Sequence, residues 1–277
     1  MDIAETIGQM KVLRRSITGS VGFVPTMGFL HDGHLSLVKK AREENDVVVV
    51  SIFVNPTQFG PNEDFETYPR DTKRDLSLLQ DAHTDIVFFP SRNEMYPDAF
   101  NTWVEVKQVT EHLEGTCRPD HFLGVTTVVA KLFNIVEPAR AYFGQKDAQQ
   151  AIVIQKMVSD LNMNLDVIVL PTCRESDGLA MSSRNTYLNT QERQAATILF
   201  RALTHAKNLY KDGQRDADLI RNEMLSLINQ EQLAYVEYVS IADKHTLNEL
   251  SKITSSALIS LAVRIGKTRL IDNIILK

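Results

Sequence analysis

The sequence predicts an α/β protein, with a doubly wound (Rossmann-like) parallel sheet followed by a smaller C-terminal α+β domain. Strand-like and helix-like segments alternate through the first two-thirds of the 277 residues. Two of the strand-like segments, residues 46–54 and 165–170, are nearly continuous apolar runs, as expected when helices cover both faces of a sheet. We therefore expect a first domain over residues 1–173 and a second over residues 174–277.

The elements of the first domain follow one another in a regular order. The segments that predict strands are residues 21–24, 46–54, 85–89, 140–143 and 165–170. Helical periodicity lies between them, at residues 35–44, 71–81, 126–135 and 148–161. Ligands of such sheets bind beyond the carboxyl ends of the strands, so the loops after the strands are the candidate sites.

The second domain is expected to contain two helices followed by strands. Residues 190–211 and 217–229 predict two amphipathic helices, with Thr190 as the N-cap of the first. Strand-like segments follow at residues 235–241, 257–265 and 268–276, the last two joined by a Gly266-Lys267 turn.

Composition excludes several classes of protein. The formal net charge of −5 and the lack of a dense basic stripe argue against a nucleic-acid-binding protein. The longest apolar stretch, residues 47–54, is far shorter than the ~18 residues that span a bilayer, so we expect no membrane association. The start carries Asp2 and Glu5 and has no apolar segment typical of a secretory signal. With Cys117 and Cys173 far apart in the chain, we expect a cytoplasmic protein without disulfides or structural zinc.

The first motif is PTMGFLHDGH, at residues 25–34, between the first predicted strand and a helix. Glycines allow close approach of the backbone, and the free N–H groups at the helix start can bind an anion. His31 and His34 are three residues apart, so both rings can face the same ligand. Phosphate contact is the favoured interpretation. Helix capping by one histidine, or half of a metal site, remain the alternatives, although zinc would need further ligands.

Two further loops offer donors to phosphate. MSSRN, at residues 181–185, combines adjacent hydroxyls with a guanidinium, although Ser-Ser-Arg alone is ordinary loop composition. FGQKD, at residues 143–147, follows the fourth strand, where Gly144 allows a tight turn and Lys146 supplies a charge. One of Gln149 and Gln150 should then face the carboxyl edge of the sheet.

The fourth loop, FVNPTQFG at residues 53–60, carries two amides just past a buried strand. Unsatisfied amides are expensive there. Asn55 and Gln58 therefore either hydrogen-bond the backbone of the turn or bind a ligand, and the spacing alone does not decide between these roles.

These loops resemble a known family along the whole chain. PTMGFLHDGH is similar to the HIGH-type signature of the nucleotidylyltransferase superfamily, and MSSRN stands where that superfamily carries its KMSKS-type loop. VSIFVNPTQFG, RPDHFLGVTTVVAKLFN and FGQKDAQQ resemble one family within it, the pantothenate synthetases (pantoate–β-alanine ligases). The resemblance implies a cytoplasmic ligase of pantothenate biosynthesis that condenses pantoate with β-alanine through a pantoyl adenylate, releasing AMP and pyrophosphate. It also implies a homodimer and a second domain that covers the active site.

The resemblance further implies roles for individual residues. His34 is expected to donate a proton to the phosphates beside His31, with Lys146 and Arg184 as the other catalytic residues. Cys173 is expected to contact the adenine region through its backbone, and residues 181–184 to close on the triphosphate. The expected ATP-binding residues are Met27, Gly28, Phe29, Leu30, His31, Asp32, Gly33, His34, Gly144, Gln145, Lys146, Asp147, Cys173, Met181, Ser182, Ser183 and Arg184. Substrate binding is expected from Gln58, Gln150 and Asn55, with Arg118 and His121 as weaker candidates.

Magnesium should accompany ATP, typically held by one or two carboxylates together with phosphate. The segment that would supply them reads Lys73-Arg74-Asp75, so Asp75 is the one carboxylate candidate there. The alternatives to a ligase are an enzyme that transfers a nucleotide to a phosphorylated acceptor and a non-catalytic nucleotide sensor. The amide pair argues against the first, and the presence of His34, Lys146 and Arg184 argues against the second.

Overall fold

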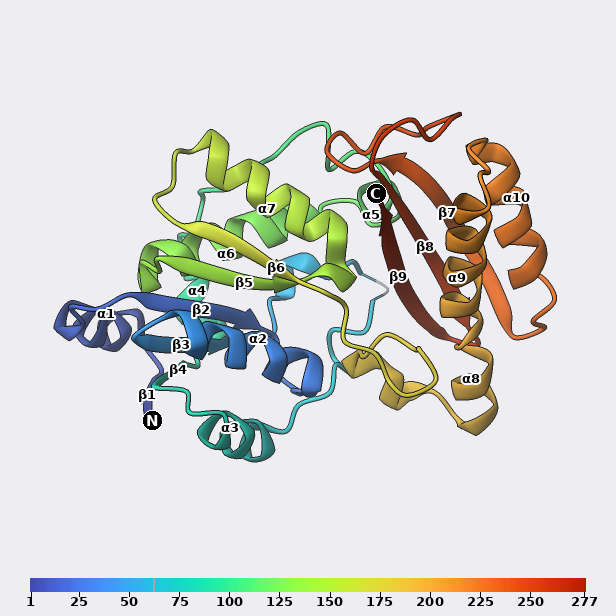
Figure 1. Ribbon diagram of the computed structural model, residues 1–277. Helices are drawn as coiled ribbons and strands as arrows, with labels where there is room; N and C mark the ends of the chain where they lie inside the picture. The colour runs from blue at the N-terminus through green and yellow to red at the C-terminus, as the bar shows by residue number, and fades with distance from the viewer. Residues whose placement is uncertain (62) are drawn as a thin grey trace. The chain divides into compact units, whose positions relative to one another are not determined.

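The structure is a computed structural model that describes residues 1–61 and 63–277 (Figure 1). The chain divides into two compact units. The larger unit contains residues 1–145 and 149–171, and the smaller unit contains residues 146–148 and 172–277. Residues 146–148, which follow a strand of the larger unit, thus group with the C-terminal part of the chain.

The larger unit is built on a parallel six-stranded sheet in the order β1-β4-β3-β2-β5-β6. Its strands are β1 (Asp2–Ala4), β2 (Val21–Thr26), β3 (Val47–Ile52), β4 (Ile86–Phe88), β5 (Arg140–Gly144) and β6 (Asp166–Leu170). The order reverses direction at β2, which pairs with both β3 and β5. The predicted fold class is confirmed. The sequence does not predict the edge strand β1, because only one of its three residues, Ala4, is buried.

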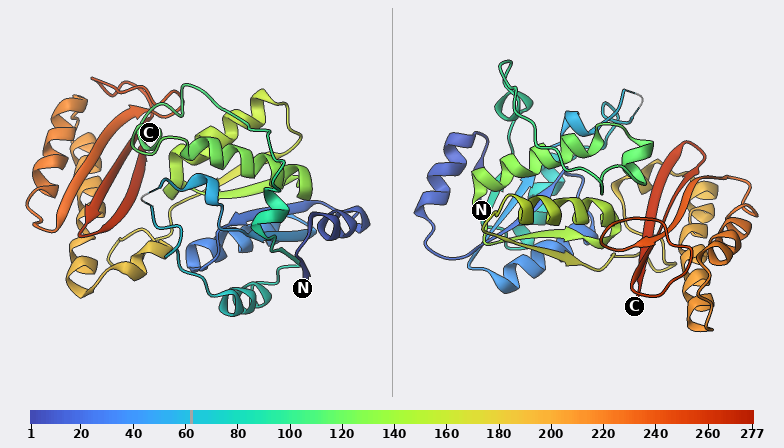
Figure 2. Two further views of the ribbon diagram at one scale, coloured as in Figure 1. Left: turned by 180° about the vertical axis from the view of Figure 1, so that it is seen from behind. Right: turned by 90° about the horizontal axis from the view of Figure 1, so that it is seen from above.

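Helices cover both faces of this sheet (Figures 1 and 2). One face carries α2 (Asp32–Glu44) and α3 (Thr72–Asp81), and the other carries α6 (His121–Val136) and α7 (Ala148–Asp160). Side chains alternate between the faces. Val24 packs on the α2 face, whereas Phe23 contacts Phe133 of α6 with ring centroids 6.4 Å apart. The remaining helices are α1 (Ile7–Ser16), α4 (Arg92–Met95), α5 (Glu114–Cys117) and the 3-10 turns η1 (Pro56–Gln58) and η2 (Gln145–Asp147).

The smaller unit packs two helices against an antiparallel sheet. The sheet order is β7-β8-β9, formed by β7 (Ala234–Asp243), β8 (Ala257–Ile265) and β9 (Thr268–Leu276). α9 (Ile198–Lys211) and α10 (Ala217–Ile228) cover one face, where Leu203, Ile220 and Ile259 are fully buried (Figure 1). The unit begins with the 3-10 turn η3 (Ser183–Tyr187) and α8 (Thr190–Ala195).

The prediction of one helix over residues 190–211 is wrong, because α8 ends at Ala195 and α9 begins at Ile198. The N–H of Thr197 donates to the carbonyl of Gln194, and that of Leu199 to Ala196, so hydrogen bonds to the third residue back tighten the backbone here. The N-cap is Asn189 rather than Thr190, and its side chain accepts from Gln191 and Glu192. The apolar periodicity continues across the break, so the sequence pattern could not reveal where α8 ends and α9 begins.

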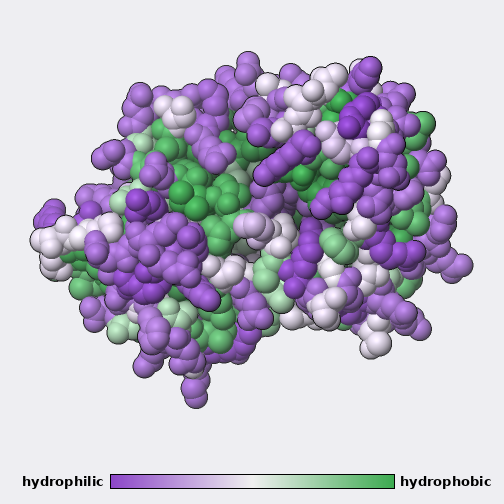
Figure 3. All heavy atoms as spheres, viewed as in Figure 1, coloured by the Kyte–Doolittle hydropathy of each residue, from purple (hydrophilic) through white to green (hydrophobic). Residues whose placement is uncertain are grey.

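Hydrophilic side chains cover most of the face shown in Figure 3, and an apolar patch remains over the region of β6. The side chains of β6 from Val167 to Leu170 are only half-buried. No helix among the described residues is long and apolar enough to cross a membrane.

Candidate active site

The chain turns sharply between β2 and α2, within the PTMGFLHDGH motif. Gly28 has a φ of 82° and Phe29 a φ of 51°, in the left-handed region that suits glycine and is uncommon for other residues. The N–H groups of Phe29 and Leu30 donate to the two carboxylate oxygens of Asp75, at 2.7 and 2.8 Å. Asp75 is only 1% exposed. Its carboxylate therefore holds the signature turn in its unusual conformation.

This use of Asp75 bears on the expected magnesium site. The pKa of the Asp75 carboxyl is raised, and burial is the main cause. The two backbone N–H donors lower this pKa, but by less than burial raises it. Both oxygens already accept hydrogen bonds from the turn. Among residues 1–61 and 63–277, no group of three His, Cys, Asp or Glu side chains is placed to hold a metal ion. The contact that the structure shows for Asp75 is therefore with the backbone of the signature turn.

His31 and His34 lie together at the start of α2. His31 is the N-cap residue, and the two ring centroids are 4.0 Å apart. The backbone N–H of His31 donates to Nδ1 of His34 at 3.3 Å. When Nδ1 accepts a hydrogen bond, the neutral ring carries its hydrogen on Nε2. Nε2 is thus the atom of His34 that can donate to a ligand.

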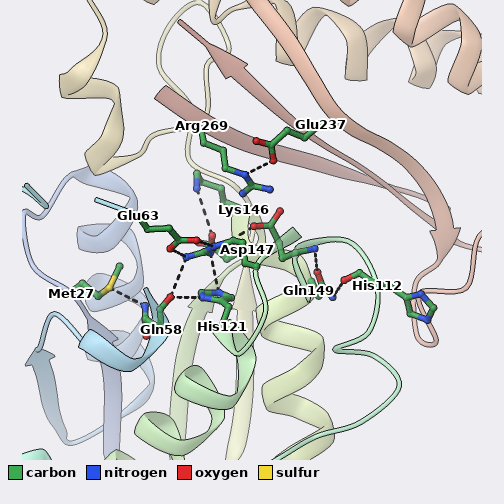
Figure 4. Close-up of polar contacts among 12 residues, drawn as sticks. Met27, Gln58, Glu63, His112, His121, Lys146, Asp147, Gln149, Glu237 and Arg269 are labelled. Atoms are coloured by element: carbon green, nitrogen blue, oxygen red, sulfur yellow. Dashed lines mark hydrogen bonds and ion pairs between the residues drawn. The ribbon is translucent and has the colours of Figure 1, made fainter. Parts of the chain in front are cut away.

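The turn η1 places Gln58 beside the signature turn (Figure 4). Asn55 is buried at the start of η1, and its Nδ2 donates to Oε1 of Gln58 at 3.2 Å and to the carbonyl of Gly124 at 3.1 Å. Nε2 of Gln58 lies 3.0 Å from Sδ of Met27. Of the two roles that the sequence left open for Asn55, these contacts favour holding the turn.

Side chains at the end of α5 and at the start of α6 hold the backbone of the same turn. The carbonyl oxygen of Gln58 lies 2.8 Å from Nδ1 of His121 and 3.2 Å from Nη2 of Arg118. Arg118 in turn forms a two-pronged ion pair with Glu63, with both N···O distances 2.6 Å. Burial raises the pKa of the Glu63 carboxyl, but the hydrogen bond and charge of Arg118 outweigh burial and lower it.

Close packing of η1 on α6 depends on Gly124. A Cβ at this position would lie 2.3 Å from the carbonyl oxygen of Thr57, which is closer than real Cβ contacts. The glycine therefore allows the backbone of η1 to approach the helix.

The contacts of His121 define its protonation. Its Nε2 lies 3.2 Å from Nη1 of Arg118, and a guanidinium can only donate, so Nε2 must accept. Nδ1 then carries the hydrogen and donates it to Gln58. Burial, followed by the charge of Arg118, lowers the pKa of His121 to about 4. The ring is consequently neutral at pH 7.

Gln149 and Gln150 begin α7 and have different surroundings. Gln149 is buried; its Oε1 accepts from the N–H of Glu114 at 3.0 Å, and its Nε2 donates to the carbonyls of Val109 and His112 at 2.9 and 2.8 Å (Figure 4). Its amide is thus occupied in holding the segment that leads into α5. Gln150 is half-buried and remains the candidate for substrate binding.

The FGQKD loop supplies one charged pair. Nζ of Lys146 lies 3.6 Å from Oδ1 of Asp147, and the two side chains are 20% and 47% exposed. Gly144 does not have a positive φ, so the tight turn expected there does not require a glycine. Apart from Gly144 itself and its two chain neighbours, no described residue has an atom within 4 Å of where its Cβ would stand. That open space lets a ligand approach the backbone.

The MSSRN motif follows a tight hairpin of the smaller unit. The N–H of Met181 donates to the carbonyl of Cys173 at 3.0 Å, and Arg174 pairs with Ala180 across the hairpin. Ser182 is the N-cap of η3, and its Oγ accepts from the N–H of Arg184 at 3.3 Å. The backbone of MSSRN is therefore fixed by its own turn and by the hairpin beneath it.

The residues that the sequence predicts to bind ATP or substrate fall into two groups, one in each unit. The larger unit brings Gln58 and Asn55 to the signature turn, and the smaller unit contains Lys146, Asp147, Cys173 and the MSSRN motif. Sequence reasoning missed Glu63, and it named Gln149 only as an alternative to Gln150 and not as a supporting residue. It also missed Asp272 and Asn273, although two adjacent polar residues inside the apolar run of β9 could have identified that pair.

Comparisons with known proteins agree with these motifs. The sequence model of the pantoate-beta-alanine ligase family matches residues 2–275. Pantothenate synthetases from Herpetosiphon aurantiacus and Roseiflexus castenholzii are 59% and 58% identical to this chain, each over 100% of both chains.

Solved structures of similar proteins share the fold. A pantothenate synthetase from Thermus thermophilus has a TM-score of 0.95 at 45% identity, covering 99% of both chains. A pantoate-beta-alanine ligase from Francisella tularensis, complexed with beta-gamma ATP and beta-alanine, has a TM-score of 0.82 at 40% identity, covering 99% of this chain and 97% of that chain. With its family match over almost its full length and its signature segments intact, the chain belongs to the pantoate–β-alanine ligase family.

Proposed function

We propose that this chain joins pantoate to β-alanine in a reaction driven by ATP. The observation that carries the proposal is the family match over residues 2–275. In the first step, the pantoate carboxylate attacks the α-phosphorus of ATP, and pyrophosphate leaves. In the second step, the amine of β-alanine attacks the acyl carbon of the pantoyl adenylate, which releases pantothenate and AMP.

The two steps need positioning and charge stabilisation more than a protein nucleophile. A free carboxylate is a poor acyl donor because oxide would have to leave, whereas AMP leaves readily. Negative charge grows on the departing pyrophosphate during the first step. Fixed donors placed toward that charge lower the barrier, and holding both reactants in line supplies much of the remaining acceleration.

ATP binding is assigned to the residues of the signature turn, the FGQKD loop and the MSSRN motif. His34 donates from Nε2 to the phosphates beside His31, a role supported by the hydrogen bond that His34 Nδ1 accepts. Lys146 and Arg184 neutralise phosphate charge, and Asp147 contacts the ribose. The other proposed ATP-binding residues are Met27, Gly28, Phe29, Leu30, Asp32, Gly33, Gly144, Gln145, Cys173, Met181, Ser182 and Ser183.

The acceptor side of the reaction is assigned to two amides. Gln58 binds pantoate and β-alanine, and Gln150 binds pantoate. The contact of Gln58 with Met27 of the signature turn supports this assignment, because it places the amide next to residues that would hold ATP. Asn55 is engaged in hydrogen bonds to Gln58 and Gly124, so we assign it to orienting Gln58.

Magnesium is proposed to arrive with ATP, bound mainly to phosphate oxygens and water. The hydrogen bonds that Asp75 accepts from Phe29 and Leu30 support this choice over coordination by Asp75. Bound in this way, the ion would shield phosphate charge.

A homodimer is also proposed. β6 ends the sheet order, and its half-buried side chains from Val167 to Leu170 leave an apolar edge (Figure 3). Unpaired sheet edges of this kind favour association with another chain. Sedimentation equilibrium of the purified protein should give twice the chain mass, and a monomer at micromolar concentration would reject the dimer.

The cytoplasm is the proposed location, where both thiols, Cys117 and Cys173, would stay reduced. The structure holds both as free cysteines. Fractionation of cells that express the native chain should recover it with cytoplasmic markers, and recovery outside the cytoplasm would contradict the assignment.

The proposed reaction is tested by its products. Purified enzyme given ATP, magnesium, pantoate and β-alanine should form pantothenate and AMP in equal amounts, measured by liquid chromatography. Mixtures that omit one substrate serve as controls and should form no pantothenate. Release of ADP in place of AMP, or AMP formation with no pantothenate, would overturn the proposal.

A further inference from the structure

Two adjacent polar residues, Asp272 and Asn273, are buried in β9 of the smaller unit. They are 2% and 4% exposed within a strand that is otherwise largely apolar. Burying a carboxylate and an amide costs free energy unless both find hydrogen-bond partners. The hydrogen-bond partners of this pair therefore indicate what the two buried side chains do.

Asn273 reaches the FGQKD loop. Its Nδ2 donates to the backbone carbonyl of Lys146 at 2.8 Å. Its own N–H donates to Oδ1 of Asp272 at 2.7 Å, which ties the two residues to each other. The loop that carries Lys146 is thus attached to β9 more than a hundred residues further along the chain.

Asp272 reaches the hairpin before the MSSRN motif. Its two oxygens accept from Nη1 and Nη2 of Arg174, at 2.6 and 2.9 Å. Nη1 of Arg174 also donates to the carbonyl of Gly178 at 3.0 Å, so the guanidinium closes the hairpin while it holds the strand. A two-pronged pair of this kind fixes orientation as well as distance.

Contacts within the hairpin link the position of Arg174 to that of the MSSRN motif. Arg174 pairs with Ala180, and the N–H of Met181 bonds to the carbonyl of Cys173. Gly178 packs against Phe200, where a Cβ would lie 2.0 Å from the ring. The backbone leading into MSSRN is therefore fixed relative to Arg174.

We propose that Asp272 and Asn273 are positioning residues for ATP binding. They fix the Lys146 loop and the MSSRN hairpin in position relative to each other. All of these residues belong to the smaller unit. The inference rests on the proposed function, since it takes Lys146 and MSSRN to bind ATP. The competing possibility is that the buried pair only stabilises the fold.

The first test uses Asn273→Ala with Ser260→Ala as its matched control. Ser260 stands opposite Asn273 on the neighbouring strand β8 and is also buried, and its Oγ has no hydrogen-bond partner among the described residues. Loss of one hydrogen bond to the Lys146 loop should raise the KM for ATP or lower kcat by about two- to tenfold. The KM for pantoate should stay unchanged, and Ser260→Ala should match the wild type in every parameter.

A double-mutant cycle then separates positioning from stability. If Asn273 acts through Lys146, then Asn273→Ala should change kcat/KM for ATP by less than about twofold in a Lys146→Ala background. A merely structural role predicts a lower melting temperature, a smaller active fraction, an unchanged KM for ATP and the same loss in both backgrounds. That pattern would overturn the proposal.

Two further measurements keep the test decisive. If Asn273→Ala fails to fold, Asn273→Ser, which retains a shorter donor, replaces it in the cycle with the same expected pattern. Direct binding of ATP, followed by isothermal titration calorimetry, does not depend on the reaction. Weaker ATP binding by the Asn273 variant would support positioning even if the wild type made no pantothenate, whereas equal binding and equal kinetics would reject it.

Discussion

Asp75 is the carboxylate that the sequence offers as a magnesium ligand, and the structure shows what both of its oxygens contact. A carboxylate near a nucleotide site is an obvious candidate to hold magnesium. The structure instead buries it beneath the signature turn, where it accepts from Phe29 and Leu30. A sequence cannot show that the two N–H groups of a left-handed turn point at a carboxylate so much further along the chain.

Replacing Asp75 by Asn should damage the turn and not the metal site. An amide presents one oxygen and one NH₂ group, so it can accept from only one of the two backbone donors. The buried N–H left over costs about 1–3 kcal/mol, which should appear as lower stability in urea denaturation. The KM for ATP should rise, while the magnesium concentration needed for half-maximal rate changes less than about twofold. A large increase in that magnesium requirement would instead identify Asp75 as a ligand.

His34 is the residue on which the chemistry of the first step depends most. His34→Ala removes the Nε2 donor, and loss of one transition-state donor typically costs about 10²–10³-fold in kcat. The change is expected in steady-state assays of a folded variant. Its melting temperature should fall only slightly, because His34 is half-buried and the change removes one capping hydrogen bond of α2. A variant that keeps nearly normal kcat would remove His34 from this role.

Among the elements, the turn η1 is held by side chains at the end of α5 and at the start of α6. His121 and Arg118 both donate to the carbonyl of Gln58, and Glu63 fixes Arg118. The arrangement requires a neutral His121, since a protonated ring could no longer accept from Arg118. Acid should therefore loosen the turn that carries Gln58.

The pH dependence of stability follows from the lowered pKa of His121. Its pKa is about 4 in the folded protein against 6.5 in the unfolded chain, so the unfolded chain binds a proton first as pH falls. The stabilisation is complete above pH 6.5 and is lost as pH falls toward 4. Between pH 7 and pH 5 the loss is at most about 2 kcal/mol.

Urea denaturation of the wild type and of His121→Phe at both pH values measures this loss. Phe keeps an aromatic ring but does not titrate, so the variant should lose less stability than the wild type over this interval. Glu63 has a lowered pKa and contributes mainly below pH 5, because its unfolded value is 4.5. Equal losses in the two proteins would show that His121 is not buried in neutral form.

The elements that could be predicted are those with a strong apolar pattern. β3 and β6 are predictable as apolar runs, and α3 as an amphipathic helix. The predicted start of α2 lies too late in the chain, because its first turn, Asp32-Gly33-His34, has no apolar residue. The helix α6 also begins earlier than predicted, at His121, although Phe122 and Leu123 of its first turn are apolar. The break between α8 and α9 is a change in the backbone hydrogen bonds, and the apolar pattern of the sequence does not show it.

At the scale of the whole molecule, the motifs could be predicted but their supports could not. Signature segments depend on local residue types, which a sequence displays directly. The supporting contacts join distant parts of the chain, such as Asn273 to Lys146 or Gln149 to His112. The grouping of residues 146–148 with the C-terminal unit is likewise a property of long-range packing.

The central claim is that a pantoyl adenylate forms before β-alanine reacts. The most direct measurement is the exchange of labelled pyrophosphate into ATP, with enzyme, magnesium and pantoate present and β-alanine absent. We expect rapid exchange that requires pantoate, because the first step is reversible on its own. Exchange that does not depend on pantoate, or no exchange in a preparation that makes pantothenate, would contradict it.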